Sequence, residues 1–412
     1  MQLPTFYPKA VHSIEETGLT RGPVLDLALK HVYTTGTTTL RQLVNDSKLD
    51  YGVVLALFRH MQKEQLCDTK GMVGDDYEFT LTTRGRNIAE EAYKKNSYAG
   101  PVPVTLRKYC EATTAQAARP AVTKDDLRSI FSDLVIEPEM ITDLGAAIMT
   151  GGVIFLYGPT GNGKTSIAER LPRMFKDLVY IPYAVDVSGH TIKVFDPVVH
   201  EAYKQQPENI DPRWVLCSRP SLTVGGELRA EMLEPQLDDV TRICVGPIQM
   251  RANNGILIID DFGRQRMDPR ELLNRWIVPL DRRVDHLSLW SGVTFEIPFE
   301  LLVVMATNLR LSDLAEEAFI RRLKNKIKVE AMGRETFIQV LRRVAKDRGL
   351  TSEPEMERYA VEQCEQHSPD GLRACYPRDI LNILCGVAAF EQRTPTFDKQ
   401  SMNRALHLYF VH

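Results

Sequence analysis

The sequence has little that would assign it to a membrane, an oxidising compartment or a highly charged partner. Its seven cysteines are scattered, odd in number and never spaced as C-x-x-C, so we expect free thiols in a reducing environment rather than a disulfide framework. The longest apolar runs are far shorter than the ~20 residues of a membrane span. The opening MQLPTFYPKAVHS lacks the basic-then-apolar pattern of a leader peptide. Together these absences predict a cytoplasmic protein that contacts no membrane.

The composition is that of an ordinary globular protein. Apolar residues make up 43% and charged residues 25% of the chain, and the net charge is −3, which gives no global attraction to nucleic acid or to an acidic membrane. We find no internal repeat and no low-complexity tract. At 412 residues the chain is too long for one core, so we expect two or three domains.

The most informative segment is GPTGNGKTS, residues 158–166. It follows an apolar run of strand length, 152–157, and precedes a helical pattern over 166–171. A strand, a glycine-rich loop and a helix in this order are the context of the G-x-x-x-x-G-K-[ST] phosphate-binding loop. The alternative is a glycine-rich turn with a chance lysine, but the agreement of three elements argues against it.

This loop predicts a site for ATP and Mg²⁺. Its glycines let the backbone turn tightly and present N–H groups to phosphate oxygens. Lys164 is expected to reach the β- and γ-phosphates, and the Thr165 hydroxyl to bind Mg²⁺. The expected nucleotide-contacting residues are Gly158, Pro159, Thr160, Gly161, Asn162, Gly163, Lys164, Thr165 and Ser166.

Two carboxylates, Asp260 and Asp261, stand at the end of a second apolar strand, 255–260. Carboxylates at the carboxyl end of such a buried parallel strand lie where ligands bind in open α/β sheets. We expect Asp260 to hold Mg²⁺ through water and Asp261 to orient or deprotonate the attacking water. The alternative is a strand followed by an aspartate-rich turn.

Four further polar residues occupy positions that suit a nucleotide site. Asn308 follows the apolar strand 301–306 and could bind the γ-phosphate or the attacking water, although such an asparagine commonly caps a turn. Arg321 and Arg322 end a helical pattern, where cations are also ordinary. Arg378 follows Pro377 at the start of another helical pattern.

In this order the motifs resemble the AAA+ ATPase family over about residues 123–412. The resemblance implies Walker A at 158–165, Walker B at 256–261, a sensor-1 role for Asn308, arginine fingers at Arg321 and Arg322, and a sensor-2 role for Arg378. The passage GPIQMRANNGILIIDD looks like that of the MoxR and magnesium-chelatase branch. Room for an inserted hairpin within 187–254, and a hairpin pattern over 286–296, fit the same branch.

The resemblance also implies a homo-oligomeric ring, most often a hexamer, with ATP at the subunit interfaces. One residue departs from the family pattern, because Asp261 stands where the family usually has glutamate. The shorter side chain implies that hydrolysis is slow.

The predicted fold class is α/β, a parallel AAA+ sheet with a helical lid behind a small winged helix-turn-helix-like domain. The strands are expected at 152–157, 178–185, 255–260, 301–306 and 325–330. The expected division is a winged-helix-like domain at 20–97, a linker at 98–122, a nucleotide-binding domain at 123–330 and a helical lid at 331–412.

The small domain leaves two kinds of partner open. Residues 1–100 carry twelve Lys and Arg against twelve Asp and Glu, whereas DNA binding depends on neutralising phosphates with basic side chains. Docking to a protein is therefore favoured over contact with DNA. The leading interpretation is an oligomeric ATPase that remodels an unidentified protein partner. The alternatives are an ATP-dependent DNA-binding regulator or loader, and a slow nucleotide-gated switch.

Overall fold

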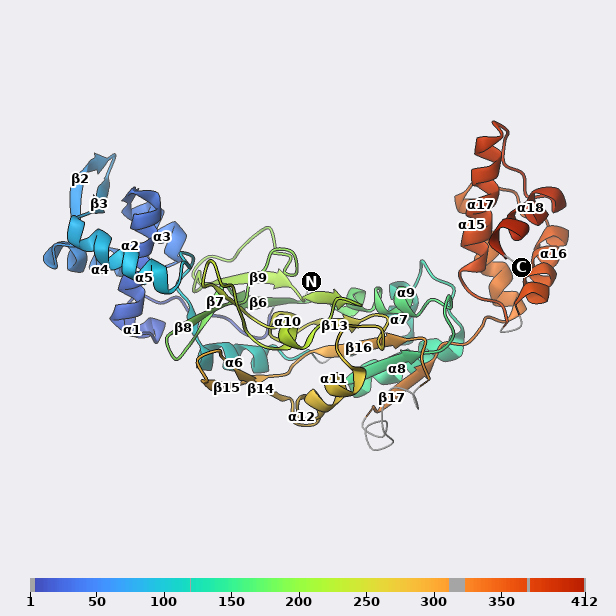
Figure 1. Cartoon of the computed structure of the whole chain (residues 1–412), viewed down its shortest axis with the longest axis horizontal. Coiled ribbons are helices and arrows are strands. Elements are labelled where there is room, and N and C mark those ends of the chain that lie inside the picture. The colour runs from blue at the N-terminus through green and yellow to red at the C-terminus, as the bar shows by residue number, and fades with distance from the viewer. Residues whose placement is uncertain (1–3, 119, 311–322, 369–370, 411–412) are drawn as a thin grey trace.

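The computed structural model describes the chain except for residues 1–3, 119, 311–322, 369–370 and 411–412. Three groups of elements follow one another along it (Figure 1). We refer to residues 14–102 as the N-terminal unit, to 103–330 as the central unit and to 331–410 as the C-terminal bundle. No helix among the described residues is both long and apolar enough to cross a membrane.

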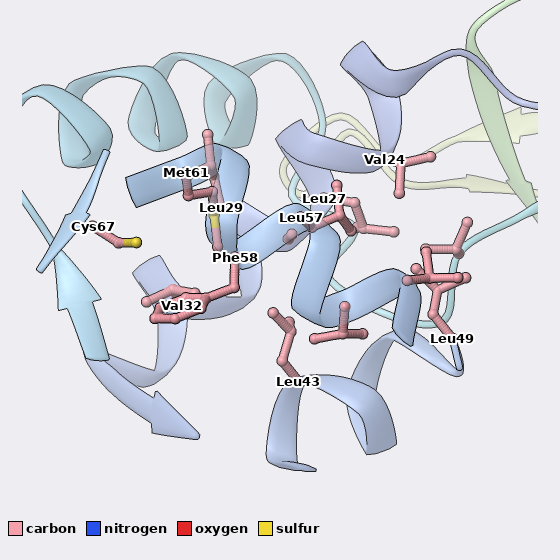
Figure 2. Close-up of a cluster of buried hydrophobic side chains, with 14 of the residues drawn as sticks. Val24, Leu27, Leu29, Val32, Leu43, Leu49, Leu57, Phe58, Met61 and Cys67 are labelled. Carbon is pink, nitrogen blue, oxygen red and sulfur yellow. The ribbon is translucent and has the colours of Figure 1, made fainter. Parts of the chain in front are cut away.

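The N-terminal unit packs helices against a small antiparallel sheet of strand order β1-β3-β2. Thr39 and Asp50 cap two of the helices by accepting the N–H groups of Gln42 and Gly52 at 3.2 and 2.8 Å. Figure 2 shows buried apolar side chains of this unit, most of them from α2 and α4 and others from α3 and β2. The elements are α1 (Ile14–Thr17), α2 (Arg21–Thr35), β1 (Thr37–Thr39), α3 (Leu40–Ser47), α4 (Tyr51–Lys63), β2 (Cys67–Val73), β3 (Asp76–Leu81) and α5 (Thr83–Lys95). Helices thus precede and follow the paired strands β2 and β3, and β1 adds a third strand to their sheet.

A five-stranded parallel sheet forms the middle of the central unit. In spatial order its strands are β10 (Ser221–Val224), β13 (Ile256–Ile259), β16 (Leu302–Thr307), β5 (Val153–Tyr157) and β17 (Asn325–Lys328). One face packs against α10 (Ile248–Ala252) and α11 (Pro269–Arg275), and the other against α7 (Lys124–Ile130), α8 (Pro138–Thr150) and α9 (Lys164–Ala168). Parallel sheets need such cover on both faces, and the predicted α/β class is confirmed.

The prediction that residues 178–185 form a strand of this sheet is wrong. The run 178–185 forms β6 (Leu178–Pro182) and the start of β7 (Ala184–Val187), which pair outside the central sheet with β9 (Trp214–Ser218) and β8 (His190–Lys193). Its place at the sheet edge is taken by β10. An apolar run shows that a strand is buried but not which strand it pairs with, and the half-exposed edge strand β10 has no such run.

The segment 98–122, expected as a linker, contains ordered elements. Strand β4 (Val104–Thr105) pairs with β7, and helix α6 (Leu106–Ala115) buries Tyr109 and Ala112 in the core of the central unit. Thr105 caps α6 by accepting the Lys108 N–H at 3.3 Å. Pro101 and Pro103 both precede this strand instead of interrupting it, where a proline is tolerated because no ladder hydrogen bond is needed.

The rest of the central unit consists of short elements around the sheet. A hairpin of β14 (Val284–Ser288) and β15 (Thr294–Pro298) confirms the turn pattern read over 286–296. The remaining elements are the 3₁₀ helices η1 (Leu171–Met174) and η2 (Ala230–Leu233), the strands β11 (Gln236–Leu237) and β12 (Cys244–Val245), and helix α12 (Ile277–Arg282). Strands β11, β12, β8, β7 and β4 form a second sheet.

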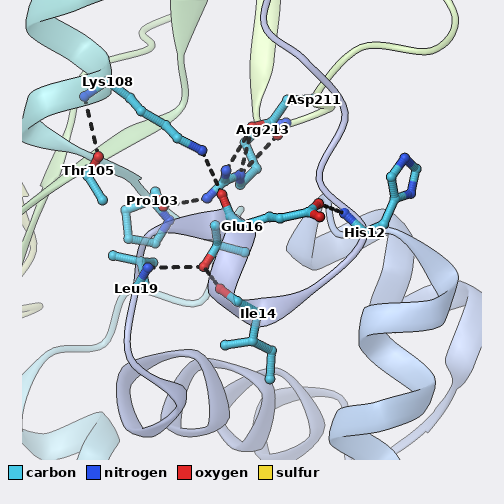
Figure 3. A network of polar contacts seen from close by, with 10 residues as sticks. His12, Ile14, Glu16, Leu19, Pro103, Thr105, Lys108, Asp211 and Arg213 are labelled. Atoms are coloured by element: carbon cyan, nitrogen blue, oxygen red, sulfur yellow. Dashed lines mark hydrogen bonds and ion pairs between the residues drawn. The ribbon is translucent and has the colours of Figure 1, made fainter.

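The N-terminal unit is joined to the central unit on both of its sides. Before α1, the Phe6 ring lies 5.5 Å from that of Trp214, and Pro8 O accepts the Asp211 N–H at 3.0 Å. After α5, the Ser97 N–H donates to Thr241 O at 3.0 Å. At the start of the central unit, Pro103 O accepts from the buried Arg213, whose guanidinium is also paired with Asp211. Figure 3 shows this network, which Lys108 extends by donating to Glu16 O at 2.7 Å.

Four helices form the C-terminal bundle, as the helical pattern from 331 onward predicts. They are α15 (Arg334–Asp347), α16 (Pro354–His367), α17 (Tyr376–Phe390) and α18 (Lys399–Tyr409). Their apolar faces share one core.

Candidate functional site

The phosphate-binding loop leaves β5 at Tyr157, and α9 begins at Lys164. Three of its glycines have positive φ, +141° at Gly158, +86° at Gly161 and +87° at Gly163, a region that other residues avoid. Gly158 also approaches a neighbouring backbone, because a Cβ there would lie 2.3 Å from Val329 O. The loop therefore needs glycine at these positions for its shape.

The Lys164 ammonium is nearly buried and lies against this loop. It donates to Gly158 O at 2.9 Å and to Pro159 O at 2.8 Å. Burial lowers its pKa, and the carboxylates of Asp261 and Asp260 oppose that shift. Because an ammonium group has three donors, one N–H remains for a phosphate oxygen.

The loop meets the end of β13, which is separated from β5 by β16 in the sheet, through a hydroxyl–carboxylate pair. Thr165 Oγ1 donates to Asp260 Oδ1 at 3.0 Å, so the two residues predicted to hold Mg²⁺ lie side by side. Both supply the oxygen ligands that Mg²⁺ takes, with water completing its coordination shell. Asp261 follows at φ +48°, so the chain turns sharply directly after the first carboxylate.

Asn308, after β16, reaches the same loop. Its Nδ2 donates to Thr160 Oγ1 at 3.1 Å. Its Oδ1 is buried and has no hydrogen-bond partner among the described residues, and the same holds for Oδ1 of Asn162 within the loop. Unsatisfied buried acceptors are costly, and two of them in one cleft indicate a place for a ligand or water with donors.

The predicted arginines divide into one that lies at the cleft and two whose positions are not described. Arg378 lines the cleft and its Nε donates to Asp379 Oδ1 at 3.3 Å. Arg321 and Arg322 lie outside the described residues.

A cleft of about 750 Å³ connects these groups. Besides the phosphate-binding loop, Asp260, Asp261 and Asn308, its lining has an apolar part contributed by the central unit and the C-terminal bundle. The apolar lining residues are Leu134, Val135, Ile136, Met140, Met332, Val340 and Val344. Pockets for small molecules combine such apolar walls with a few polar groups. Sequence reasoning missed this wall, because its residues come from two segments about 200 positions apart that only the fold brings together.

The residues present fit Mg-ATP. The glycine loop and Lys164 suit phosphates, the Thr165–Asp260 pair suits the metal, and the apolar wall suits the flat base. Two contacts tie the wall across the cleft, since Thr336 Oγ1 donates to Glu137 Oε1 and Arg343 Nη2 donates to Ser132 O, both at 2.5 Å.

Comparison with known proteins gave limited similarity. Residues 333–408 match a family described as a domain of unknown function, DUF8689. No curated protein matched. Among solved structures, NtrX from Brucella abortus is similar with a TM-score of 0.38 and 14% identity over 77% of this chain, which spans 60% of the NtrX chain. A mutant of RuvB from Thermotoga maritima is similar with a TM-score of 0.36 and 10% identity over 71% of this chain and 73% of its own. Both structural likenesses are partial, so the strand order and loop geometry of this chain are what define its fold.

Proposed function

We propose that this chain is an ATPase of the AAA+ type that binds Mg-ATP in the cleft and hydrolyses it. The observation that carries the proposal is the convergence of three strand ends on one loop. Lys164 follows β5, Asp260 follows β13 and bonds Thr165, and Asn308 follows β16 and bonds Thr160. Each of these positions suits a different part of the reaction.

The proposed roles follow from the chemistry of each group. Lys164 uses its remaining N–H, and then those now given to loop carbonyls, to bind β- and γ-phosphate oxygens. Asp261 accepts a proton from the attacking water, and Asn308 Oδ1 accepts a hydrogen bond from that water or its neighbour. Mg²⁺, held by Thr165 and Asp260, supplies the positive charge that offsets the charge of the phosphates.

We further propose that the chain acts as a homo-oligomeric ring, most simply a hexamer of the MoxR-like branch, that remodels a protein partner. In this proposal the arginine pair Arg321 and Arg322 serves a neighbouring subunit, Arg378 couples the nucleotide to the C-terminal bundle as a lid, and the N-terminal unit is a winged-helix-like docking module. The equal numbers of basic and acidic residues over 1–100 favour a protein over DNA as the docked partner.

Binding of a fluorescent ATP analogue to Lys164→Ala tests the nucleotide site directly. Loss of the charge-assisted contacts should weaken binding by about tenfold or more, while circular dichroism stays unchanged. Lys204→Ala removes an exposed lysine outside the cleft and should bind as the wild type does. A folded Lys164→Ala protein with wild-type affinity would contradict the proposed site.

A further inference from the structure

The phosphate-binding loop is held from outside by the C-terminal bundle. Gly161 O accepts the N–H of Cys375, the residue directly before α17, at 3.0 Å. The Cys375 side chain lies against the same glycine, because a Cβ at Gly161 would be 2.7 Å from its Sγ. Burial raises the pKa of the Cys375 thiol, so this side chain packs as a neutral group, and the polar contact is made by the backbone.

This hydrogen bond fixes the orientation of one peptide group in the loop. A peptide bond is planar and trans, so its C=O and N–H point in opposite directions. While Gly161 O faces Cys375, the N–H of Asn162 must point away from the bundle. Backbone N–H groups of such loops are what bind phosphate oxygens.

The segment that carries Cys375 is also bonded to the connection between the central unit and the bundle. Met332 N–H donates to Leu372 O at 2.8 Å, and the two residues form an antiparallel bridge. Residues 371–375 thus touch the phosphate-binding loop at one end and the start of the bundle at the other. A change in the conformation of the loop can therefore affect the start of the bundle through two backbone hydrogen bonds, Cys375 N–H to Gly161 O and Met332 N–H to Leu372 O.

We propose that the backbone N–H of Cys375 positions the phosphate-binding loop, and that through this bond phosphate binding and the orientation of the C-terminal bundle are coupled. This inference rests on the proposed ATP binding. Cys375 is a positioning residue: its N–H acts on the phosphates through the Gly161–Asn162 peptide.

Cys375→Pro removes this donor, and it also disfavours the present backbone conformation of Ala374, because Cys375 is the third residue of the turn that the Tyr376 N–H closes on Arg373 O at 3.2 Å. Cys375 has φ −75°, which lies within the range that proline imposes. Cys375→Ala is the matched control, since it also removes the thiol but keeps the N–H. In the full-length protein we expect the proline variant to bind the fluorescent ATP analogue about three- to tenfold more weakly than the alanine variant, the effect of one hydrogen bond.

Hydrogen exchange of the same proteins measures whether phosphate binding and the C-terminal bundle are coupled. In the wild type and in Cys375→Ala, the ATP analogue should slow amide exchange in the phosphate-binding loop and in the first turn of α17 together. In Cys375→Pro, protection should be confined to the loop. Equal affinities and equal α17 protection in the two variants would overturn the coupling while leaving ATP binding intact.

Two further outcomes are also decisive. If the wild type binds no nucleotide, the proposed function and this inference both fail. If Cys375→Pro does not fold, exchange at the Cys375 amide of the wild type decides instead. Protection there that increases with the ATP analogue supports the coupling, and unchanged exchange beside a protected loop refutes it.

Discussion

Asp261 combines a special backbone conformation with a proposed catalytic role. Its φ of +48° lies in the left-handed region, which Asp and Asn enter several-fold more readily than most residues. This gives a backbone reason for aspartate where the resembling family has glutamate. A glutamate would reach further toward the water but would fit this turn less well.

Asp261→Asn should keep ATP bound and stop its hydrolysis. Asparagine tolerates the same backbone conformation, and removing a general base typically costs about 10²–10⁴ in rate. Phosphate release and binding of the ATP analogue measure the two effects separately. Asp261→Glu keeps the carboxylate and should hydrolyse ATP faster than the asparagine variant. Wild-type turnover by Asp261→Asn would show that another group activates the water.

Gly85 at the start of α5 is expected to be essential for the N-terminal unit. A Cβ at this position would lie 2.0 Å from Leu66 O, so Gly85→Ala forces α5 away from the connection between α4 and β2 and should destabilise this unit by about 1–3 kcal/mol. Faster hydrogen exchange of the α4 and α5 amides measures the loss.

Gly22→Ala provides the control for Gly85→Ala. Gly22 lies in α2, and a Cβ added there would have no heavy atom within 4 Å beyond its own helix and chain neighbours. Because Gly22 lies in the first turn and precedes Pro23, which disfavours the helical conformation of a residue with a Cβ, alanine should bring little or no stabilisation there. If both variants leave exchange in α4 and α5 unchanged, the close approach of Gly85 to Leu66 does not constrain the unit.

The N-terminal unit should not bind duplex DNA tightly, despite its arrangement of helices and paired strands. Helix α4, the candidate for groove contact, begins with the apolar or uncharged residues Tyr51, Gly52 and Val53, and the unit lacks excess positive charge. Titration of the full-length protein with random duplex at physiological salt should give non-specific binding no tighter than about 10⁻⁴ M. A submicromolar constant that weakens steeply with added salt would favour the DNA-binding alternative instead.

The sequence predicts a feature well when the residues that form it are close together in the chain, and poorly when they come from distant segments. The loop at 158–166 and the carboxylates after β13 are local patterns, so the sequence alone is enough to single them out. Strand β10 is short and half exposed and left no pattern. The apolar wall of the cleft and the Cys375–Gly161 bond join segments far apart in the chain, and a single sequence does not reveal such pairings.

Assembly is the property on which the proposed hydrolysis depends most. The resembling family completes its site with an arginine from the next subunit, and such a residue is worth about 10³–10⁵ in rate. We expect specific ATPase activity to rise with protein concentration as subunits associate. The double variant Arg321→Ala/Arg322→Ala should bind ATP and hydrolyse it poorly.

Mixing that double variant with Lys164→Ala subunits is the sharper experiment. The double variant keeps an intact cleft, and the Lys164→Ala neighbour supplies intact arginines, so mixed assemblies should regain part of the activity. Phosphate release from proven co-assemblies measures this. Mixtures as inactive as the separate variants would argue against a shared site.

The two attachments of the N-terminal unit limit how it can move. A domain that is attached through a single flexible segment can rotate in every direction. This unit is held both before α1, at Phe6 and Pro8, and after α5, at Pro103. Direct contacts add to these two anchors, since Lys108 donates to Glu16 O and the Ser97 N–H donates to Thr241 O at 3.0 Å, so a cut in either connecting segment alone would leave the unit bound by the other segment and by these contacts.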